Sequence, residues 1–236
     1  MTDHPALLFD FGGTLDADGI PWAVRFYAAY RAAGGTTEFA AFEPLFKISD
    51  RTLERLPDIR SCGYLQMIAT QTRLLCDLLP DGAKLDSEQI VERFHTDARA
   101  VVARNTPLLA RLSRELGFRL GIVSNFTGNL ELCLSELGLL ELFVTVTDSA
   151  VVGMMKPDRR LFSETLERMG ATAATSWMVG DNFEADIRPA AALGLRTCWI
   201  APADRRAPEG LAPTIRIDRL TELEPLLVSG TARASA

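Results

Sequence analysis

The sequence lacks long apolar runs, paired cysteines and an export signal at its amino terminus. No run reaches the roughly 18–20 apolar residues of a membrane span. The four cysteines are scattered without a Cys-x-x-Cys pair, which argues against zinc or a disulfide framework and favours reduced thiols. The first five residues contain no basic segment followed by an apolar core. We therefore expect a cytoplasmic protein with no membrane partner.

The chain also lacks an excess of basic charge and has few histidines. Its 25 Lys and Arg stand against 31 Asp and Glu, which gives a net charge of −6, and no basic face or tail is evident. We therefore expect no nucleic-acid partner. The two histidines, His4 and His95, suggest no catalytic pattern, and His95 is expected to pack beside Phe94 on a helix. The sequence leaves the oligomeric state open.

What is present is a globular composition, with 236 residues of which 47% are hydrophobic and 24% are charged. This length holds one large domain, or one domain that carries an insert. After residue 105, short apolar runs alternate with helical segments. Strands are predicted at 6–9, 119–124, 143–147, 177–180, 196–200 and 214–217. Repeated β-α units of this kind imply an α/β fold, in which helices cover both faces of a parallel sheet.

Capping residues and glycines delimit the helices predicted in this half of the chain. Thr106-Pro107 combines an N-cap residue with proline at the first helical position, which predicts that a helix begins there. Further helices are predicted from about 129 to 137, from 157 to 169, and from the end of the 177–180 strand to 193. Pro189 is expected to kink or tighten the last of them.

Residues 16–104 have a different, helical pattern. No strand is predicted there beyond a possible hairpin at 16–19, and amphipathic helices are predicted over 21–33, 63–79 and 86–103. Trp22 and Phe26 share one face of the first of these helices, where core packing is the favoured role and contact with a site beneath the helices is the alternative. The predicted organisation is a core of residues 1–15 and 105–228, a helical cap domain over 16–104, and a flexible tail over 229–236.

Polar side chains stand at the ends of several predicted strands. Asp10 follows the 6–9 strand, Ser124 ends the next strand, and Asp181 follows 177–180 with Asp186 five residues later. Lys156 precedes a predicted helix. Parallel strands bring such ends to one edge of a sheet. Three carboxylates, a hydroxyl and an ammonium at that edge suit a hard divalent cation bound beside an anion.

Together these residues form motifs that resemble the haloacid dehalogenase superfamily of hydrolases, most of which are magnesium-dependent phosphatases. The matching segments are Asp10-Phe11-Gly12-Gly13-Thr14, Ser124 after its apolar strand, Lys156-Pro157-Asp158, and Gly180-Asp181-Asn182-Phe183-Glu184-Ala185-Asp186. The resemblance implies a Rossmann-like, doubly wound parallel-sheet core. It also implies that the insertion between the first and second motifs is an all-helical cap domain.

The resemblance implies a role for each residue of these motifs. Asp10 is the nucleophile that takes up a phosphoryl group, and Lys156 offsets charge on Asp10 and on the phosphoryl oxygens. The implied substrate-binding residues are Thr14, Ser124 and Asn125. The implied Mg²⁺ ligands, direct or through water, are Asp10, Asp181, Asp186 and the carbonyl oxygen of Gly12. The implied partner is a small phosphorylated substrate.

One position departs from the family's pattern. Its phosphatases carry a second Asp two residues after the nucleophile, where it protonates the leaving group, and this chain has Gly12. General acid–base catalysis contributes about 10²–10⁴-fold in rate, or roughly 3–5 kcal/mol of barrier. The sequence therefore predicts a phosphatase with a slow or atypical proton step, favouring acyl or aryl phosphates. Asp16 and Asp18 lie nearby, but both fit turn residues better than a replacement acid.

Three other interpretations stay open. A dehalogenase needs no such acid, but the family's dehalogenases work without metal, and this chain keeps Asp181 and Asp186. A phosphonate hydrolase would need a cap lysine, for which Lys47 and Lys84 are the candidates, although both fit solvated charges better. A protein that binds a phosphorylated ligand without catalysis is the third. The favoured prediction is a magnesium-dependent hydrolase of a small phosphorylated metabolite.

Overall fold

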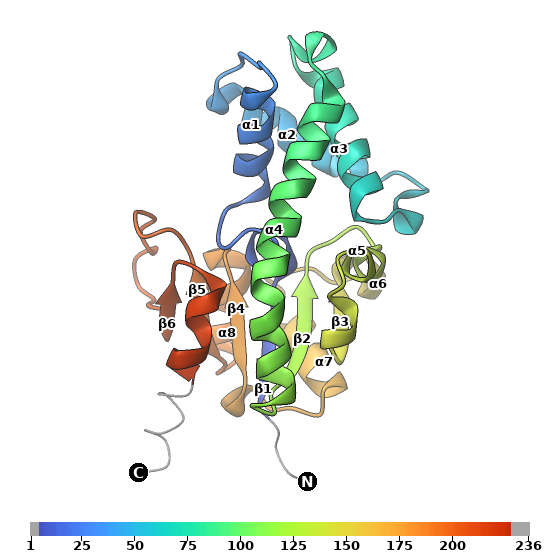
Figure 1. Ribbon diagram of the computed structural model, residues 1–236. Helices are drawn as coiled ribbons and strands as arrows, with labels where there is room; N and C mark the ends of the chain where they lie inside the picture. The colour runs from blue at the N-terminus through green and yellow to red at the C-terminus, as the bar shows by residue number, and fades with distance from the viewer. Residues whose placement is uncertain (1–4, 228–236) are drawn as a thin grey trace.

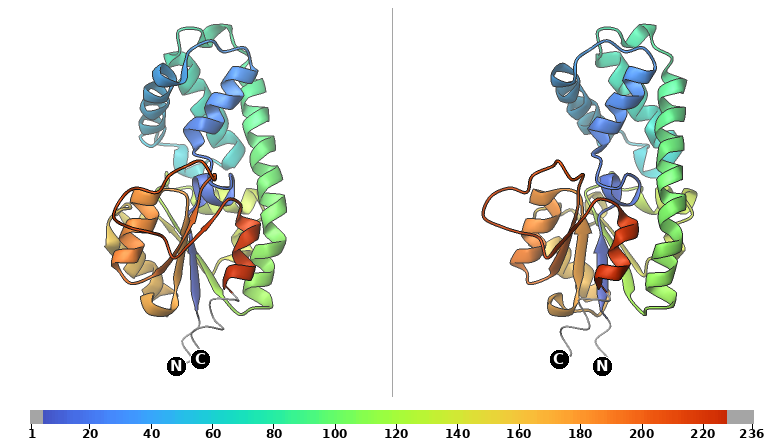
Figure 2. Two further views of the ribbon diagram at one scale, coloured as in Figure 1. Left: turned by 90° about the vertical axis from the view of Figure 1, so that its left-hand side faces the viewer. Right: turned by 60° about the vertical axis from the view of Figure 1, so that its left-hand side comes forward.

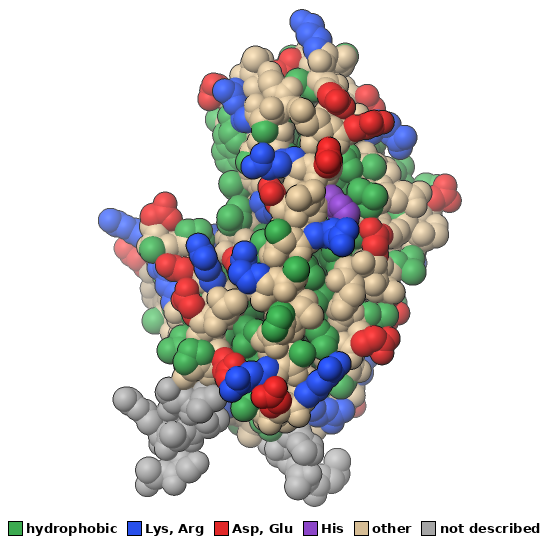
Figure 3. All heavy atoms as spheres, viewed as in Figure 1, with side chains coloured by type: hydrophobic (Ala, Val, Ile, Leu, Met, Phe, Trp, Pro, Cys, Tyr) green, Lys and Arg blue, Asp and Glu red, His purple; other side chains and the backbone are tan. Residues whose placement is uncertain are grey.

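The computed structural model describes residues 5–227, and it places a helical cap above a sheet-containing core (Figure 1). The predicted tail over 229–236 and His4 lie outside the described residues. No helix within 5–227 is long and apolar enough to cross a membrane. On the face seen in Figure 3, acidic and basic side chains are interspersed over both cap and core.

The core is built on a sheet of six parallel strands in the order β3-β2-β1-β4-β5-β6. The strands are β1 (Ala6–Phe9), β2 (Arg119–Ser124), β3 (Thr145–Asp148), β4 (Trp177–Gly180), β5 (Arg196–Ile200) and β6 (Ile215–Ile217). β1 lies in the middle, where Leu8 is opposite Gly121 of β2 and Met178 of β4. The predicted α/β fold with a parallel sheet is confirmed. Only β3 differs noticeably from its predicted range, beginning two residues later and extending one residue further.

Helices cover both faces of the sheet. The core helices are α5 (Leu130–Glu136), α6 (Ser149–Val152), α7 (Arg159–Arg168) and α8 (Arg188–Ala192). Side chains alternate along β1, so that Leu7 and Phe9 pack in the cluster that contains residues of α5, while Ala6 and Leu8 pack with residues of α7 and α8. All four of these β1 residues are fully buried, as expected for the central strand of a parallel sheet.

The cap contains α1 (Trp22–Ala32), α2 (Phe39–Leu53), α3 (Tyr64–Leu78) and the first part of α4 (Ser87–Arg114). All of residues 16–104 are described, and they contain no strand; the hairpin prediction at 16–19 is wrong, because these residues form a turn. The fourth helix, α2, was not predicted from the sequence. It places Phe42 and Phe46 in an aromatic cluster, where the Phe26 ring lies 4.2 Å from that of Phe94.

α4 joins the two parts without a break and is about 42 Å long (Figure 2). The prediction that a new helix begins at Thr106-Pro107 is wrong, and the predicted boundary between 104 and 105 falls inside α4. The Thr106 hydroxyl donates to the Val102 carbonyl at 2.7 Å instead of capping a helix. Packing at both ends keeps the helix continuous past Pro107, with Phe94 buried in the cap and Leu109 in the core.

Two other helix predictions need correction in the core. α7 begins at Arg159 and not at Pro157, because the Asp158 carboxylate accepts a hydrogen bond from the Arg160 backbone N–H at 2.9 Å and caps the helix. After β4, residues 183–187 form an irregular helical turn before α8, and Pro189 lies in the first turn of α8. Proline is well tolerated there because the N–H groups of the first turn need no partner within the helix.

Candidate active site

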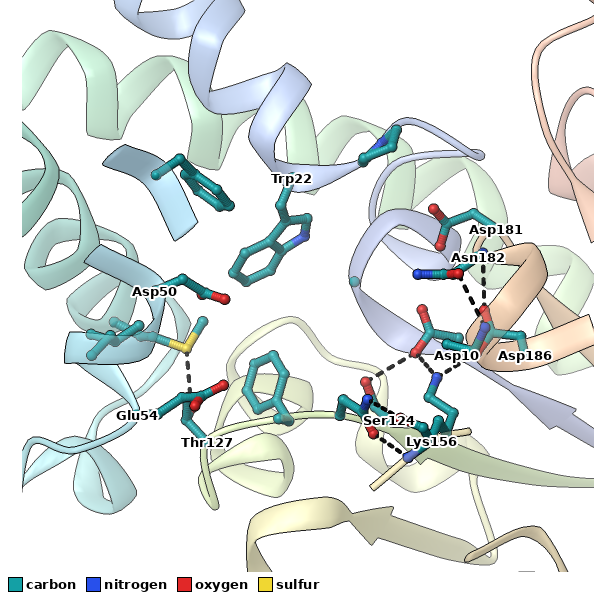
Figure 4. Close-up of a pocket in the computed structure, with 18 residues that line it drawn as sticks. Asp10, Trp22, Asp50, Glu54, Ser124, Thr127, Lys156, Asp181, Asn182 and Asp186 are labelled. Atoms are coloured by element: carbon teal, nitrogen blue, oxygen red, sulfur yellow. Dashed lines mark hydrogen bonds and ion pairs between the residues drawn. The ribbon is translucent and has the colours of Figure 1, made fainter. Parts of the chain in front are cut away.

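The predicted site residues meet at the carboxyl edge of the sheet, beneath the cap. Asp10 follows β1, Ser124 ends β2 and Asp181 follows β4, and these three strands are neighbours. A cavity of about 250 Å³ lies above them between core and cap (Figure 4). This volume suits a small molecule.

Lys156 connects two of the carboxylates. Its Nζ lies 2.6 Å from Asp10 Oδ1 and 2.6 Å from Asp186 Oδ1, and the Ser124 hydroxyl donates to Asp10 Oδ1 at 3.1 Å. Burial disfavours the ammonium form, but the two carboxylates outweigh it and raise the pKa of Lys156. Lys156 is therefore a fixed positive charge, and it holds one oxygen of Asp10 while Oδ2 stays less constrained.

Asp181 is held against Asp10 through Thr14. The Thr14 hydroxyl lies 3.2 Å from Asp181 Oδ1 and 3.4 Å from Asp10 Oδ2, and it accepts a hydrogen bond from the Asp181 N–H at 3.1 Å. Thr14 is fully buried and is absent from the described cavity lining. The sequence predicted Thr14 as a substrate contact, whereas these contacts favour a positioning role beneath the carboxylates.

The turn after β1 requires glycine at position 13. Its φ of +95° lies in the left-handed region, and a Cβ there would lie 2.7 Å from Asp181 Oδ1. The Gly13 N–H donates to Asp16 Oδ1 at 2.8 Å. Gly13 thus allows the loop of Asp10 and the loop of Asp181 to approach closely.

The three carboxylates are arranged as a cation site. One oxygen each from Asp10, Asp181 and Asp186 can be chosen within 4.8 Å of one another, and all three residues are buried. Burial and the neighbouring carboxylates raise the pKa of Asp181 well above its usual value, and burial and Asp10 raise that of Asp186 to about 6 against the opposing effect of Lys156. One ammonium does not balance three carboxylates. A hard divalent cation with oxygen ligands fits this excess of negative charge.

Asn125 is committed to the loop that carries Lys156. Its side-chain amide donates to the Lys156 carbonyl at 3.0 Å, and its side-chain oxygen accepts from the Lys156 N–H at 2.7 Å. Asn125 also lines the cavity, and its side-chain nitrogen has a second hydrogen beyond the one donated to Lys156. The pairing with Lys156 fixes the backbone from which Lys156 reaches the carboxylates.

Gly12 faces an aromatic side chain from the cap. A Cβ built at Gly12 would lie 3.2 Å from Trp22 Nε1, which is tighter than most side-chain contacts. Both residues line the cavity. The sequence favours core packing for Trp22, but its ring takes the alternative place and forms a wall of the site, while Phe26 is fully buried as favoured. Trp22 partly fills the space in which a side chain at position 12 would begin.

Asp16 holds Trp22 in this place. Its Oδ2 accepts hydrogen bonds from Trp22 Nε1 at 2.8 Å, Arg25 Nη1 at 2.7 Å and the Tyr64 hydroxyl at 2.9 Å. Asp16 is fully buried and absent from the described cavity lining, so it does not replace the missing acid. The sequence indicated only that Asp16 lies in a turn. It did not indicate that the Asp16 carboxylate connects the turn after β1 to the cap helices α1 and α3.

Asp18 is also more than a turn residue. Its carboxylate forms an ion pair with Arg104 on α4 and accepts hydrogen bonds from Asn105 Nδ2 at 3.1 Å and the Leu220 N–H at 3.2 Å. These contacts direct it toward the junction of α4 with the carboxyl-terminal part of the core. It, too, is absent from the described lining of the cavity.

The cap lysines and His95 lie away from the chemistry. Lys47 is exposed and pairs with Glu43 at 2.7 Å on α2, and Lys84 is exposed. Lys156 is the only lysine among the described residues that line the cavity. The His95 ring lies 6.1 Å from that of Tyr64, in agreement with the expected packing role.

Sequence reasoning missed the cap side of the cavity. The cap residues that line it are Pro21, Trp22, Phe46, Asp50, Leu53, Glu54 and Met67. Four of them belong to α2 or follow it directly, and this helix was not predicted. Phe42, Phe46 and Leu53 recur at helical spacing and could have indicated it.

Comparison with known proteins agrees with this geometry. A family model described as haloacid dehalogenase-like hydrolase matches residues 4–194. The chain belongs to this family. It is 38% identical over 111 residues to the pyrimidine 5'-nucleotidase YjjG of Escherichia coli, covering 46% of this chain and 49% of that protein. It is 36% identical over 118 residues to the glyceraldehyde 3-phosphate phosphatase of Methanothermobacter thermautotrophicus, covering 47% and 52%.

The resemblance to solved structures extends over nearly the whole chain. The crystal structure of the putative HAD-hydrolase YfnB from Bacillus subtilis, bound to magnesium, has a TM-score of 0.60 and 25% identity, with 96% of this chain and 99% of that chain covered. By contrast, the aligned region spans only about half of the two curated sequences above. These comparisons identify the family and the fold.

Proposed function

We propose that this protein is a Mg²⁺-dependent phosphatase that acts on a small phosphorylated compound through an aspartyl-phosphate on Asp10. The observation that carries the proposal is the buried contact of Lys156 with both Asp10 and Asp186 at 2.6 Å, beside Asp181 and beneath the cavity between core and cap. Such an arrangement can offset the charge of a bound phosphoryl group.

The first step is phosphoryl transfer to Asp10. A carboxylate oxygen of Asp10 attacks phosphorus, and the bond between phosphorus and the leaving oxygen breaks. Lys156 and Ser124 hold the other oxygen of Asp10 during the attack, which keeps the nucleophile aligned. Asp10, Asp181 and Asp186 would hold a divalent cation, which when bound would offer a further positive charge to the phosphoryl oxygens.

The second step is hydrolysis of the aspartyl-phosphate. Water attacks phosphorus, inorganic phosphate leaves, and the carboxylate of Asp10 is regenerated. Gly12 offers no side chain to protonate the leaving group or to activate this water. Asp16 and Asp18 are engaged elsewhere, so the leaving oxygen takes its proton from solvent. Aryl and acyl phosphates, whose leaving groups are stable as anions, are the favoured substrates.

The names of two curated relatives favour a phosphatase, whereas several similar solved structures are described as dehalogenases, so the choice between the two depends on the site itself. Both curated relatives are named for hydrolysis of phosphate esters, and a structural neighbour is described as bound to magnesium. A dehalogenase is disfavoured because the buried group of Asp10, Asp181 and Asp186 suits a cation. A Schiff-base phosphonate hydrolase is disfavoured because Lys47 and Lys84 are exposed and do not line the described cavity.

A substrate panel tests the proposal. We expect phosphate release from phenyl phosphate and acetyl phosphate in the presence of Mg²⁺, and its loss on addition of EDTA. Chloride release from 2-chloropropionate that persists in EDTA would instead identify a dehalogenase. Inactivation by borohydride with phosphonoacetaldehyde would identify a phosphonate hydrolase. Binding of a phosphate ester without turnover would identify a non-catalytic protein.

A further inference from the structure

The cap side of the cavity carries two carboxylates. Asp50 lies on α2 and Glu54 follows one turn later, and both line the same cavity as Asp10 and Lys156. Figure 4 shows them across the cavity from Asp10, Ser124 and Lys156. A substrate held by its phosphoryl group at the core edge therefore directs its leaving group toward these carboxylates.

Neither carboxylate has a partner within the described part of the chain. Asp50 is half-buried and Glu54 is exposed, and neither side chain forms a hydrogen bond or an ion pair there. Burial and the charge of Glu54 raise the pKa of Asp50 to about 6, against a smaller opposing effect of Arg51. An unpaired, half-buried carboxylate favours a ligand that brings a positive charge.

The cavity offers no cation of its own to this side. Lys156 is the one positively charged side chain in its described lining, and it is held by Asp10 and Asp186. A carboxylate or a second phosphate on the leaving group would meet two negative charges without compensation. The lining thus disfavours anionic leaving groups as clearly as it favours cationic ones.

Aromatic rings form part of the cavity wall. Trp22 and Phe46 come from the cap and Phe126 from the core, and the centroids of Trp22 and Phe126 lie 6.2 Å apart. Aromatic faces stabilise ammonium groups as well as flat apolar groups. A leaving group made of a ring or a short chain that ends in an ammonium group would match this cavity. Its apolar part would contact the aromatic rings, and its ammonium group would reach the two carboxylates.

We propose, on the basis of the phosphatase function proposed above, that the cavity selects phosphate esters whose leaving group carries an ammonium cation, and that Asp50 and Glu54 bind this cation. Asp50, the more buried of the two, makes the larger contribution, because hydrogen bonds to charged groups strengthen where water is excluded.

The experiment compares three aryl phosphates that differ only in the group opposite the phosphate. These are 4-(aminomethyl)phenyl phosphate, the neutral 4-ethylphenyl phosphate and the anionic 4-(carboxymethyl)phenyl phosphate. Values of kcat/KM are measured with Mg²⁺ at about pH 7.5, where the ammonium is charged and Asp50 is ionised. We expect kcat/KM to be highest for the ammonium ester, lower for the neutral ester and lowest for the anionic ester. The ammonium and neutral esters should differ by about tenfold or more.

Variants assign the preference to residues. Asp50→Asn is expected to lower the ratio of ammonium to neutral ester about tenfold and to improve the anionic ester relative to the neutral one. Glu54→Gln is expected to have the same effect at a smaller size. The matched control is Glu43→Gln, which removes the same charge from α2 at a residue absent from the described cavity lining, and it should leave the ratio within about twofold.

The outcomes separate this inference from the function on which it rests. Equal kcat/KM values for the ammonium and neutral esters in the wild type would overturn the proposed selectivity. An unchanged ratio of these two values in Asp50→Asn would also overturn it. Neither result would contradict the proposed phosphatase function. Hydrolysis of the neutral ester that requires Asp10 supports the phosphatase on its own. Failure to hydrolyse any of the three esters would instead count against the proposed function.

Discussion

The two sides of the cavity contrast in how completely their charges are paired. At the core edge, Asp10, Lys156 and Asp186 are buried, and Lys156 contacts both carboxylates directly. At the cap side, Asp50 and Glu54 face the cavity without a partner in the described structure. The charges of these core-edge residues are paired before any ligand binds, whereas the proposed substrate would pair those of the cap side. Under the two proposals, the core supplies the chemistry and the cap supplies the selectivity.

The largest effect is expected at the core edge, for Asp10→Asn. An amide does not attack phosphorus, so phosphate release from phenyl phosphate should fall by more than ~10³-fold. The measurement is initial rate with Mg²⁺ at saturating substrate. Asp97→Asn, at an exposed carboxylate on α4 that pairs with Arg93, is the control and should keep wild-type activity. Turnover by Asp10→Asn near the wild-type rate would remove Asp10 from the mechanism.

Lys156→Met should have the next largest effect. It removes the positive charge that Asp10 and Asp186 share, so kcat/KM is expected to fall by about 10²–10³-fold. The unpaired buried carboxylates should also destabilise the fold by about 3–5 kcal/mol in the metal-free protein. Urea unfolding in EDTA measures this loss, and added Mg²⁺ should recover part of it. A variant as stable and as active as the wild type would contradict the role assigned to Lys156.

Introducing an acid at position 12 tests the contact between Gly12 of the core and Trp22 of the cap. Gly12→Asp alone is expected to fit poorly, because its Cβ would meet Trp22 Nε1 at 3.2 Å. Gly12→Asp combined with Trp22→Leu should raise the rate with alkyl phosphates relative to aryl phosphates by about 10–100-fold over Trp22→Leu alone. The ratio of kcat/KM for butyl and phenyl phosphate is the measurement. Equal gains for both esters would show that the missing acid is not what limits alkyl esters.

The smallest effect is expected on the cap side, where Asp50→Asn should stabilise the protein. The pKa of Asp50 is about 6 in the fold against 3.8 for the free group, so the native state binds the proton more tightly. The free energy of unfolding therefore falls as pH rises from about 4 through about 6. The Asp50→Asn variant has no carboxylate at this position and does not show this fall. We expect a gain of about 1–2 kcal/mol above pH 7 that vanishes below about pH 4. Urea unfolding at both pH values checks it, and an equal gain at both would exclude titration of Asp50 as the cause.

The core could be predicted well from the sequence. Its strands are short apolar runs bounded by glycine and polar residues, and the polar residue after each run marks the edge at which ligands bind. Four strand ranges, including 6–9 and 177–180, agree with the structure to the residue. Asp10, Ser124, Lys156, Asp181 and Asp186 meet as expected, because parallel pairing aligns the ends of neighbouring strands.

The cap could be predicted only as a set of helices. α4 passes through Thr106-Pro107 because packing at both of its ends outweighs a local capping signal. The face that α2 turns toward the core depends on how four helices pack together, and sequence spacing alone does not determine this arrangement. The positions of Asp50 on α2 and of Glu54 directly after it could therefore not be predicted.

Local patterns of burial and turn formation were enough to predict the parallel sheet, the helical insert and the polar groups at the sheet edge. Which of these groups reach the cavity depends on packing between distant segments. Thr14 and Asp16 are absent from the described cavity lining and bind other protein groups, and Asn125 lines the cavity while it pairs with the backbone of Lys156. Trp22 reaches from the cap to Gly12. The reason is physical: a polar side chain acts through its nearest partner, and that partner is brought by packing between segments far apart in the chain.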